Sequence, residues 1–258
     1  MMSRFLAWFR DNPPQPPPPG PTTAAAAPVA GSTPAPAGKP RDGVVESYYT
    51  SGQLGFRGHY VNGRMDGMQE WYHSSGRLRE RQSYRDDVKE GPWQLFHANG
   101  QLRSSGCFIG GARNGPFEVF YASGQLRSKG THRDNHRDGP YESYHDNGEL
   151  QSRGSFAGGK KTGPWEEFHQ DGQQKLKATY KDDQLHGLVE SFRDNGRLQA
   201  REHYLDGKRD GPCESYFENG QLKTRGSYRR GMLDGPYEIY DSNGELKETG
   251  GFRNGAPR

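Results

Sequence analysis

The chain has 258 residues, of which 29% are hydrophobic and 26% are charged, and it contains 37 glycines. So few apolar residues exclude a conventional globular core of the size expected for this length, and the composition alone is close to that of disordered proteins. The formal net charge of +3 lies in residues 1–41, because the remaining 31 basic and 31 acidic residues balance; this neutrality argues against a nucleic-acid-binding surface.

The chain begins with two segments that share no pattern with the rest. Residues 1–12 are apolar and aromatic, and their side chains are candidates for a weak membrane or partner anchor. The anchor candidates are Phe5, Leu6, Trp8 and Phe9. Residues 13–41 hold 11 of the 18 prolines and an alanine run, which predicts a disordered, semi-rigid linker.

Residues 42–258 consist of nine copies of a 24-residue unit without insertion or deletion. The copies begin at Asp42, Asp66, Glu90, Asn114, Asp138, Thr162, His186, Asp210 and Asp234. A short fixed period is typical of repeat arrays, whose units bury surface only against their neighbours. The phased aromatic residues therefore outweigh the disorder-like composition.

The turn chemistry predicts that each copy is a β-hairpin. Position 11 is always glycine, and the residue before it is Asn in five copies, Ser in three and Asp in one. Asn-Gly between two short runs favours a two-residue type I′ turn, because both central residues need positive φ. The fold class is thus all-β: an elongated array of nine antiparallel hairpins, with about eighteen strands, preceded by a disordered Pro/Ala-rich tail.

Comparing the copies gives a pairing register. A two-residue turn places position 5 opposite position 16, and this aligns Glu with Arg or Lys in seven copies, for example Glu46 with Arg57. In the third copy both charges are lost together, at Gln94 and Ser105. A three-residue turn would instead shift the register by one. The two-residue register puts the charged pairs and the position-7 rings on one face, and the position-13 leucines and position-19 rings on the other.

The unit Gly-Pro-x-x-x-aromatic-x-x-Asn-Gly-x-Leu-x-x-x-Gly-x-aromatic resembles the variant MORN repeat, most clearly at residues 139–156, 211–228 and 235–252. Bacterial chains built largely of this variant resemble the YwqK-like antitoxins, which implies a protein that binds and neutralises a cognate toxin. Other MORN-type arrays are associated with membrane lipids or act as scaffolds.

Nothing in the sequence indicates catalysis, a cofactor or a metal. The Glu ladder recurs on an open sheet rather than in a shielded cleft, so solvated cross-strand pairing is the better account than paired catalytic carboxylates. The position-8 histidines are about 10 Å apart, too far to share a metal. The two cysteines lie too far apart for a disulfide, which favours a reducing cytoplasm.

Large aromatic residues occupy one position in a block of neighbouring copies, and they are candidates for a partner-binding surface. Position 4 holds Trp93, Phe117, Tyr141 and Trp165 in consecutive copies, with Trp71 nearby. Clustered large rings are typical of interface hot spots; the alternative is that they simply cover the sheet.

The repeat array predicts a non-catalytic protein-binding protein, and the resemblance implies one of the antitoxin or immunity type. We therefore expect a cognate toxin or effector as its partner, no bound nucleic acid, and a location in the cytoplasm. The alternative is a membrane-associated scaffold, anchored peripherally at the inner membrane through its N-terminal segment.

Overall fold

The computed structural model describes residues 42–258, which form one antiparallel sheet of 22 strands. The strands are β1 (Gly43–Tyr48), β2 (Leu54–Val61), β3 (Arg64–Tyr72), β4 (Leu78–Arg85), β5 (Val88–Phe96), β6 (Leu102–Ile109), β7 (Ala112–Arg113), β8 (Gly115–Phe120), β9 (Leu126–Arg133), β10 (His136–Tyr144), β11 (Leu150–Ala157), β12 (Lys160–Phe168), β13 (Gln174–Lys181), β14 (Gln184–Leu185), β15 (Gly187–Phe192), β16 (Leu198–Leu205), β17 (Lys208–Tyr216), β18 (Leu222–Arg229), β19 (Met232–Leu233), β20 (Gly235–Tyr240), β21 (Leu246–Arg253) and β22 (Ala256–Pro257).

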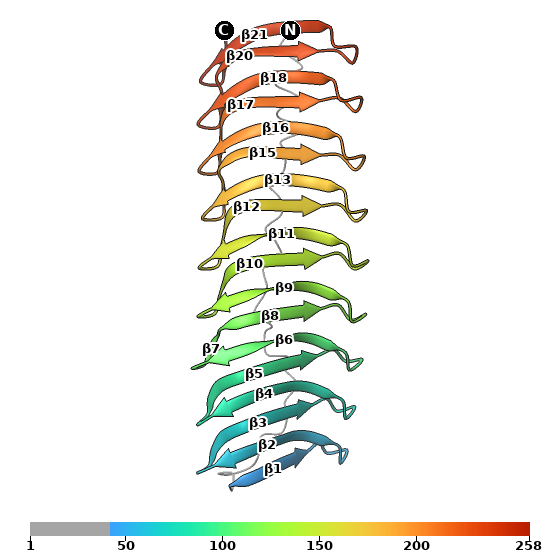
Figure 1. Cartoon of the computed structure of the whole chain (residues 1–258), viewed down its shortest axis with the longest axis vertical. Coiled ribbons are helices and arrows are strands. Elements are labelled where there is room, and N and C mark those ends of the chain that lie inside the picture. The colour runs from blue at the N-terminus through green and yellow to red at the C-terminus, as the bar shows by residue number, and fades with distance from the viewer. Residues whose placement is uncertain (1–41) are drawn as a thin grey trace. The chain divides into compact units, whose positions relative to one another are not determined.

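The strands follow one another through the sheet in chain order (Figure 1), as a simple meander. Each copy contributes two long strands; β7, β14 and β19 are two-residue pieces next to bulges, and β22 is a two-residue piece at the C-terminal end. The prediction of an all-β hairpin array is therefore confirmed. No helix among residues 42–258 is long and apolar enough to cross a membrane.

The type I′ turns connect each hairpin to the next one. At positions 21 and 22 both residues have positive φ in all nine copies, for example Asn62 (51°) and Gly63 (72°), and Val61 pairs with Arg64 across the turn. Where glycine is absent, Asp or Asn takes the left-handed conformation, as at Asp86 and Asp87, except in the eighth copy, where Arg230 does so. These short turns fix the right-handed twist between neighbouring copies.

The turn at the Asn-Gly sequence has three residues, so the predicted type I′ turn there is wrong. In the first copy the Tyr49 amide donates to the Gln53 carbonyl (2.8 Å) and the Gly52 amide to the Tyr49 carbonyl (2.9 Å). Only the glycine has positive φ, at 82°, as in a type I turn closed by a left-handed residue. A bulge then follows, because Tyr48 pairs with Leu54 but Ser47 pairs with Phe56.

The bulge compensates for the longer turn, so the predicted pairing of positions 5 and 16 is confirmed. Glu46 lies opposite Arg57, and Gln94 lies opposite Ser105. The prediction for position 13 is wrong for the same reason. Leu54 lies directly opposite Tyr48, and directly opposed residues share a face, so the leucines lie beside the position-7 rings.

A second bulge lies at position 2 in the second to ninth copies, where the strand pairs with the preceding hairpin. Glycine at this position has positive φ in all nine copies, for example 99° at Gly139. Proline follows at position 3 in six copies, such as Pro140. Proline has no amide hydrogen to donate, and a bulge is one of the few places where a sheet tolerates it.

All the residues with buried side chains among 42–258 project from one face, here named the packed face and formed by positions 4, 6, 15, 17, 19 and 24. Its continuous apolar core runs from Phe117 to Val189. Trp165, at its centre, contacts Tyr141 (6.1 Å between ring centroids), Phe156 (5.5 Å) and Tyr180 (6.2 Å). Each such ring contributes about 2 kcal/mol or more of burial free energy.

Glycine at position 17 makes this packing feasible. Gly154 lies opposite Tyr141 on one neighbouring strand, and a Cβ on it would lie 2.0 Å from the Trp165 ring. A side chain there would displace the ring, which explains why six of the nine copies have glycine at this position.

Candidate partner-binding surface

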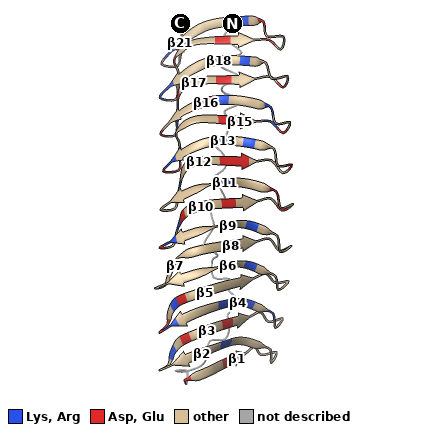
Figure 2. Ribbon diagram, viewed as in Figure 1, with Lys and Arg blue, Asp and Glu red and all other residues tan. Residues whose placement is uncertain are grey.

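The opposite face, here named the open face, carries positions 3, 5, 7, 13, 16, 18, 20 and 23. All ten of the exposed large hydrophobic side chains in the described part of the chain belong to it. A row of alternating charges crosses its centre from strand to strand. Figure 2 shows acidic and basic residues alternating along much of the sheet. The row consists of Glu46, Arg57, Glu70, Arg81, Gln94, Ser105, Glu118, Lys129, Glu142, Arg153, Glu166, Lys177, Glu190, Arg201, Glu214, Arg225, Glu238 and Thr249.

Ion pairs follow this row both within and between copies. Arg57 contacts Glu46 within a copy at 2.7 Å, whereas Lys129 contacts Glu142 of the next copy at 2.9 Å. Position-7 tyrosines add hydrogen bonds, and bonds from Tyr144 and Lys129 lower the pKa of Glu142. Such solvated pairs contribute at most about 1 kcal/mol each. They keep the row ordered and nearly neutral, so it gives the open face little long-range field.

The row has one uncharged interruption, at Gln94 and Ser105 on β5 and β6. After it, Glu118 is left without an ion pair among residues 42–258, and so is Lys177 further along. The two are separated by five strand spacings, or about 24 Å. Both side chains are exposed. Neither charge would have to leave an ion-pair partner in this sheet, so within the row these two are the charges most available to another molecule.

The predicted aromatic strip belongs to the packed face. Phe117, Tyr141 and Trp165 are only 5%, 6% and 3% exposed, so they are core residues and do not offer the exposed strip that the sequence analysis predicted. Trp93 and Trp71 are half-buried, with Trp93 next to Phe108 and Trp71 next to Phe56. Successive side chains of a strand point to opposite faces, and position 4 points to the packed face. The rings therefore cover the sheet, which was the alternative explanation.

The anchor candidates Phe5, Leu6, Trp8 and Phe9 lie outside the described residues, and their role stays a prediction.

The recurring 24-residue sequence of this two-faced meander is that of a known repeat family. The model of the family described as "MORN repeat variant" matches residues 41–62, 65–86, 89–109, 113–134, 137–157, 161–182, 209–230 and 233–254. The chain belongs to the MORN repeat variant family. Repeats of this kind are typically non-catalytic modules that bind proteins or membranes.

Solved structures give only distant likenesses to this MORN array. Three crystal structures, titled TcdB2-TccC3-TEV, TcdB2-TccC3 and TcdB2-TccC3-Cdc42, are 13%, 12% and 12% identical, with TM-scores of 0.23, 0.16 and 0.15. The matches cover 78%, 82% and 82% of this chain but only 13%, 16% and 16% of those chains. No curated protein matches the chain.

Side chains at the Asn-Gly end link successive MORN repeats in a way that the sequence analysis missed. The Asn147 amide donates to the Gln170 carbonyl one copy later (2.7 Å), and its oxygen accepts the Glu149 amide (3.0 Å). At position 8, His145 Nε2 lies 3.0 Å from the Phe168 carbonyl. These residues therefore hold neighbouring turns together, and the histidines act as packing residues. The recurrence of these Asn and His residues every 24 residues was the sequence signal from which this role could have been predicted.

The seventh repeat, which the family model leaves unmatched, places an ion pair in the packed face. Glu202 is 6% exposed and sits where the other copies have Gly, Ala or Gln. It contacts Arg209 at 2.9 Å and accepts a hydrogen bond from Tyr204 at 3.1 Å. Burial raises the pKa of Glu202 despite the nearby Arg209. Gln69 and Gln82, opposed in the second repeat, form another buried polar pair.

The two cysteines differ in their surroundings. Cys213 is 3% exposed and lies directly opposite Glu202. Burial raises the pKa of its thiol to about 12, and the Glu202 charge adds to this effect. A thiol in that state is inert as a nucleophile. Cys107 is half-buried on the open face.

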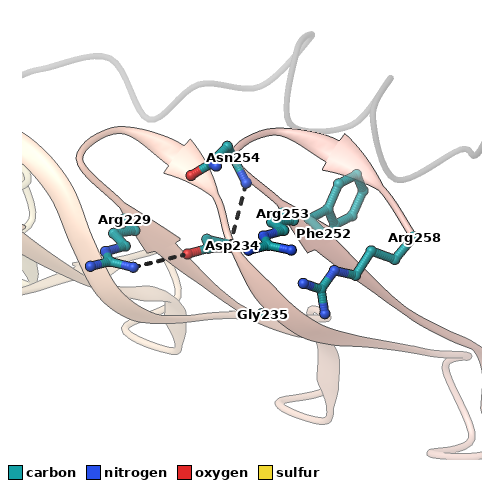
Figure 3. A pocket seen from close by; sticks show the side chains of 7 residues that line it. All are labelled: Arg229, Asp234, Gly235, Phe252, Arg253, Asn254 and Arg258. Carbon is teal, nitrogen blue, oxygen red and sulfur yellow. Dashed lines mark hydrogen bonds and ion pairs between the residues drawn. The ribbon is translucent and has the colours of Figure 1, made fainter.

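A hollow of about 380 Å³ lies at the C-terminal end of the array, next to β20 and β21 (Figure 3). It is lined by Arg229, Asp234, Gly235, Phe252, Arg253, Asn254 and Arg258. Asp234 contacts Arg229 at 3.9 Å and accepts the Asn254 amide at 3.4 Å. The three arginines are exposed, so the hollow lacks the apolar walls and buried polar groups typical of a small-molecule site.

Proposed function

We propose that the chain is a non-catalytic binding protein of the antitoxin or immunity type, which neutralises a cognate protein toxin by covering part of its surface with the open face. One observation supports the choice of face. The rings of the packed face pack against one another and are buried, whereas the open face carries all the exposed large hydrophobic side chains of residues 42–258.

The charges of the open face suggest how a partner would be recognised. Paired charges in the row offer little net attraction, because an incoming group must compete with a neighbour. Glu118 and Lys177 have no such competitor in the sheet. A partner that places a cation and an anion about 24 Å apart would satisfy both, with the half-buried rings Phe120 and Phe168 beside them for apolar contact.

The test is affinity capture from the native host with the full chain as bait. The E118A/K177A variant removes two exposed side chains without breaking an ion pair of the sheet, so its fold should be unchanged. Loss of those contacts should weaken capture at least about tenfold. D146A, an exposed turn substitution, is the matched control and should capture as well as the wild type.

Neutralisation is tested with the captured protein itself. Expressed alone it should arrest growth, and co-expression with the chain should restore growth unless the chain carries E118A/K177A. A captured protein that is harmless when expressed alone would contradict the antitoxin assignment, while leaving partner binding intact.

The alternative of a membrane-associated scaffold rests on residues 1–12 and on the membrane-binding members of this repeat class. Vesicle flotation of the full chain and of an F5S/L6S/W8S/F9S variant separates the two proposals. Flotation that depends on those four side chains supports the scaffold; a chain that never floats counts against it.

A further inference from the structure

Four cations lie in a row on the packed face, one in each of the second to fifth repeats. Each occupies position 24, as the second residue of the strand that follows a type I′ turn. They are Lys89, Arg113, Arg137 and Lys161, and all four side chains are half-buried. We name this row the cation ladder. Because each repeat adds two strands about 4.8 Å apart, its steps are about 10 Å and its length is about 29 Å.

Aromatic rings fix the direction of each cation in the ladder. Every cation lies over one or two rings of the packed face, with 4.1–5.7 Å between the charged group and the ring centre. The pairs are Lys89 over Phe108, Arg113 over Trp93, Arg137 over Tyr141 and Phe156, and Lys161 over Trp165 and Tyr180. Such cation–π contacts orient a charge without neutralising it. The ladder is therefore a preorganised set of positive charges.

The packed face supplies no acid within the ladder. Between Lys89 and Lys161 the positions of this face hold no Asp or Glu, and the acids closest in sequence are Glu80 before the ladder and Glu167 after it. None of the ion pairs within residues 42–258 involves Lys89, Arg113 or Lys161. The ladder thus concentrates positive charge in one part of a neutral array.

The packing of the sheet does not require these cations. In four other copies position 24 is apolar, at Met65, Leu185, Leu233 and Pro257. In the seventh copy it is Arg209, which is neutralised by Glu202. An apolar side chain therefore fills this place as well as a cation does, and the unneutralised cations of the second to fifth repeats call for a different explanation.

Lys161 is the member of the ladder that gains most from a bound anion. Burial lowers the pKa of Lys161, although Glu167 and Asp183 act in the opposite direction. The rings beside it belong to Trp165 and Tyr180, which are 3% and 6% exposed. Trp165 Nε1 and the Tyr180 hydroxyl have no hydrogen-bond partner among residues 42–258. An anion there neutralises a partly desolvated charge and supplies an acceptor where the fold provides none.

We propose that the cation ladder binds an acidic segment of a partner protein in the polyproline II conformation, with a carboxylate at every third residue. That helix has three residues per turn and rises about 3.1 Å per residue, so every third side chain points the same way at intervals of about 9.3 Å. This interval matches the step of the ladder, and ten residues place four carboxylates over about 28 Å. In a β-strand every third side chain would alternate between the two faces.

The half-buried ladder favours a single extended chain over a membrane or a nucleic acid. Nucleic-acid-binding domains carry an excess of basic residues, whereas residues 42–258 hold 31 basic and 31 acidic residues. Membrane-binding clusters present lysines and arginines to the lipid headgroups, whereas these four side chains lie against rings of their own sheet. Because the ladder lies on the packed face, this binding is separate from that proposed for the open face.

The test measures fluorescence anisotropy of the fluorescein-labelled peptide Glu-Pro-Pro-Glu-Pro-Pro-Glu-Pro-Pro-Glu with the full chain. The control peptide, Pro-Pro-Pro-Glu-Glu-Glu-Glu-Pro-Pro-Pro, has the same composition and charge but clusters its carboxylates. The wild type should bind the spaced peptide at least about tenfold more tightly than the clustered one. The R113M/K161M variant removes two cations and should weaken binding of the spaced peptide at least about tenfold. Its fold should be retained, since methionine already occupies position 24 at Met65.

K160M/K181M is the matched control. Lys160 and Lys181 are exposed on the open face of the fifth and sixth repeats, and their loss changes the net charge by the same amount. This variant should bind the spaced peptide as the wild type does. Near-ultraviolet circular dichroism reports whether both variants are folded, and the comparison of the two peptides on the wild type needs no variant.

Three results overturn the proposal: no binding of the spaced peptide, equal affinities for the two peptides, or unchanged binding by folded R113M/K161M. Phosphatidylserine vesicles and a strand of twelve thymidines are tested in the same way. If either binds the wild type more tightly than the spaced peptide does, and loses that affinity in R113M/K161M, the ladder belongs to a membrane or a nucleic acid and the proposal is wrong.

Discussion

His132 is the point at which acid should destabilise the array most specifically. It occupies position 19, where the other eight copies have Tyr or Phe, and its ring lies 4.3 Å from that of Phe117. Burial lowers the pKa of His132 to about 4, and the neighbouring cations Arg113 and Arg137 add to this effect. Arg137 is its direct cross-strand partner. A protonated imidazole there would be partly desolvated and placed between two guanidinium groups.

The sign of the pH dependence follows from the lowered pKa. The unfolded chain binds a proton at His132 near pH 6.5, whereas the folded chain binds it near pH 4, so the unfolded state holds more protons between these values. Stability is therefore complete above pH 6.5 and is lost as the pH falls to 4. The full shift corresponds to about 3.4 kcal/mol; because the side chain is only half-buried, we expect a loss of about 1–2 kcal/mol.

Urea denaturation of the wild type and the H132F variant at pH 7 and pH 4.5 measures this loss. Phenylalanine restores the residue type of the other copies and cannot titrate, so the variant should lose about 1–2 kcal/mol less than the wild type on acidification. All other titrating groups are common to both chains and cancel in the comparison. H136Q, at an exposed histidine, should behave as the wild type. Parallel pH dependence in wild type and H132F would refute the reasoning.

Three further experiments test the packed face. E202A should lower the free energy of unfolding in urea by about 3–5 kcal/mol, because the half-buried Arg209 loses its carboxylate partner. E202A/R209L should come within about 1 kcal/mol of the wild type, since Ala178, Leu185 and Leu233 already occupy equivalent positions. Equal losses in the two variants would count against the ion pair. G154A should lower the free energy of unfolding by about 1–3 kcal/mol, because the new Cβ would clash with Trp165. G130A should lower it less, since its Cβ would lie 3.1 Å from Phe117. The reverse order would be inconsistent with the packing. Iodoacetamide should modify Cys107 and leave Cys213 intact in the folded chain, as read by peptide mass spectrometry; rapid labelling of Cys213 would show that the packed face opens.

The sequence was sufficient for the fold because a 24-residue period repeats the same local information nine times. Any register that failed to align Glu46 with Arg57 would fail in six other copies as well. The turn geometry was harder to predict. The Asn-Gly signal is shared by two-residue and three-residue turns, and the bulge that compensates for the longer turn leaves no mark in the charge pattern. The left-handed Asp86–Asp87 turn also lacks the glycine that would have identified it.

The candidate surface was less accessible to sequence reasoning. Aromatic residues such as Trp165 serve equally as core and as interface, and only their face, set by alternation and by the glycine at position 154, distinguishes the two. The pairs of opposite charges within each copy could be predicted from the sequence. Its continuation across copies, and the unpaired Glu118 and Lys177 that result, depend on how β6, β8, β13 and β15 lie side by side.

Covalent footprinting of the complex between the full chain and its captured partner tests the central claim most directly. Carboxyl and amine labelling, with and without the partner, reads the accessibility of each exposed acid and lysine. The proposed use of the open face predicts strong protection of Glu118 and Lys177, with exposed turn residues such as Asp146 labelled equally in both states. A partner that protects the turns and leaves Glu118 and Lys177 fully labelled would contradict it.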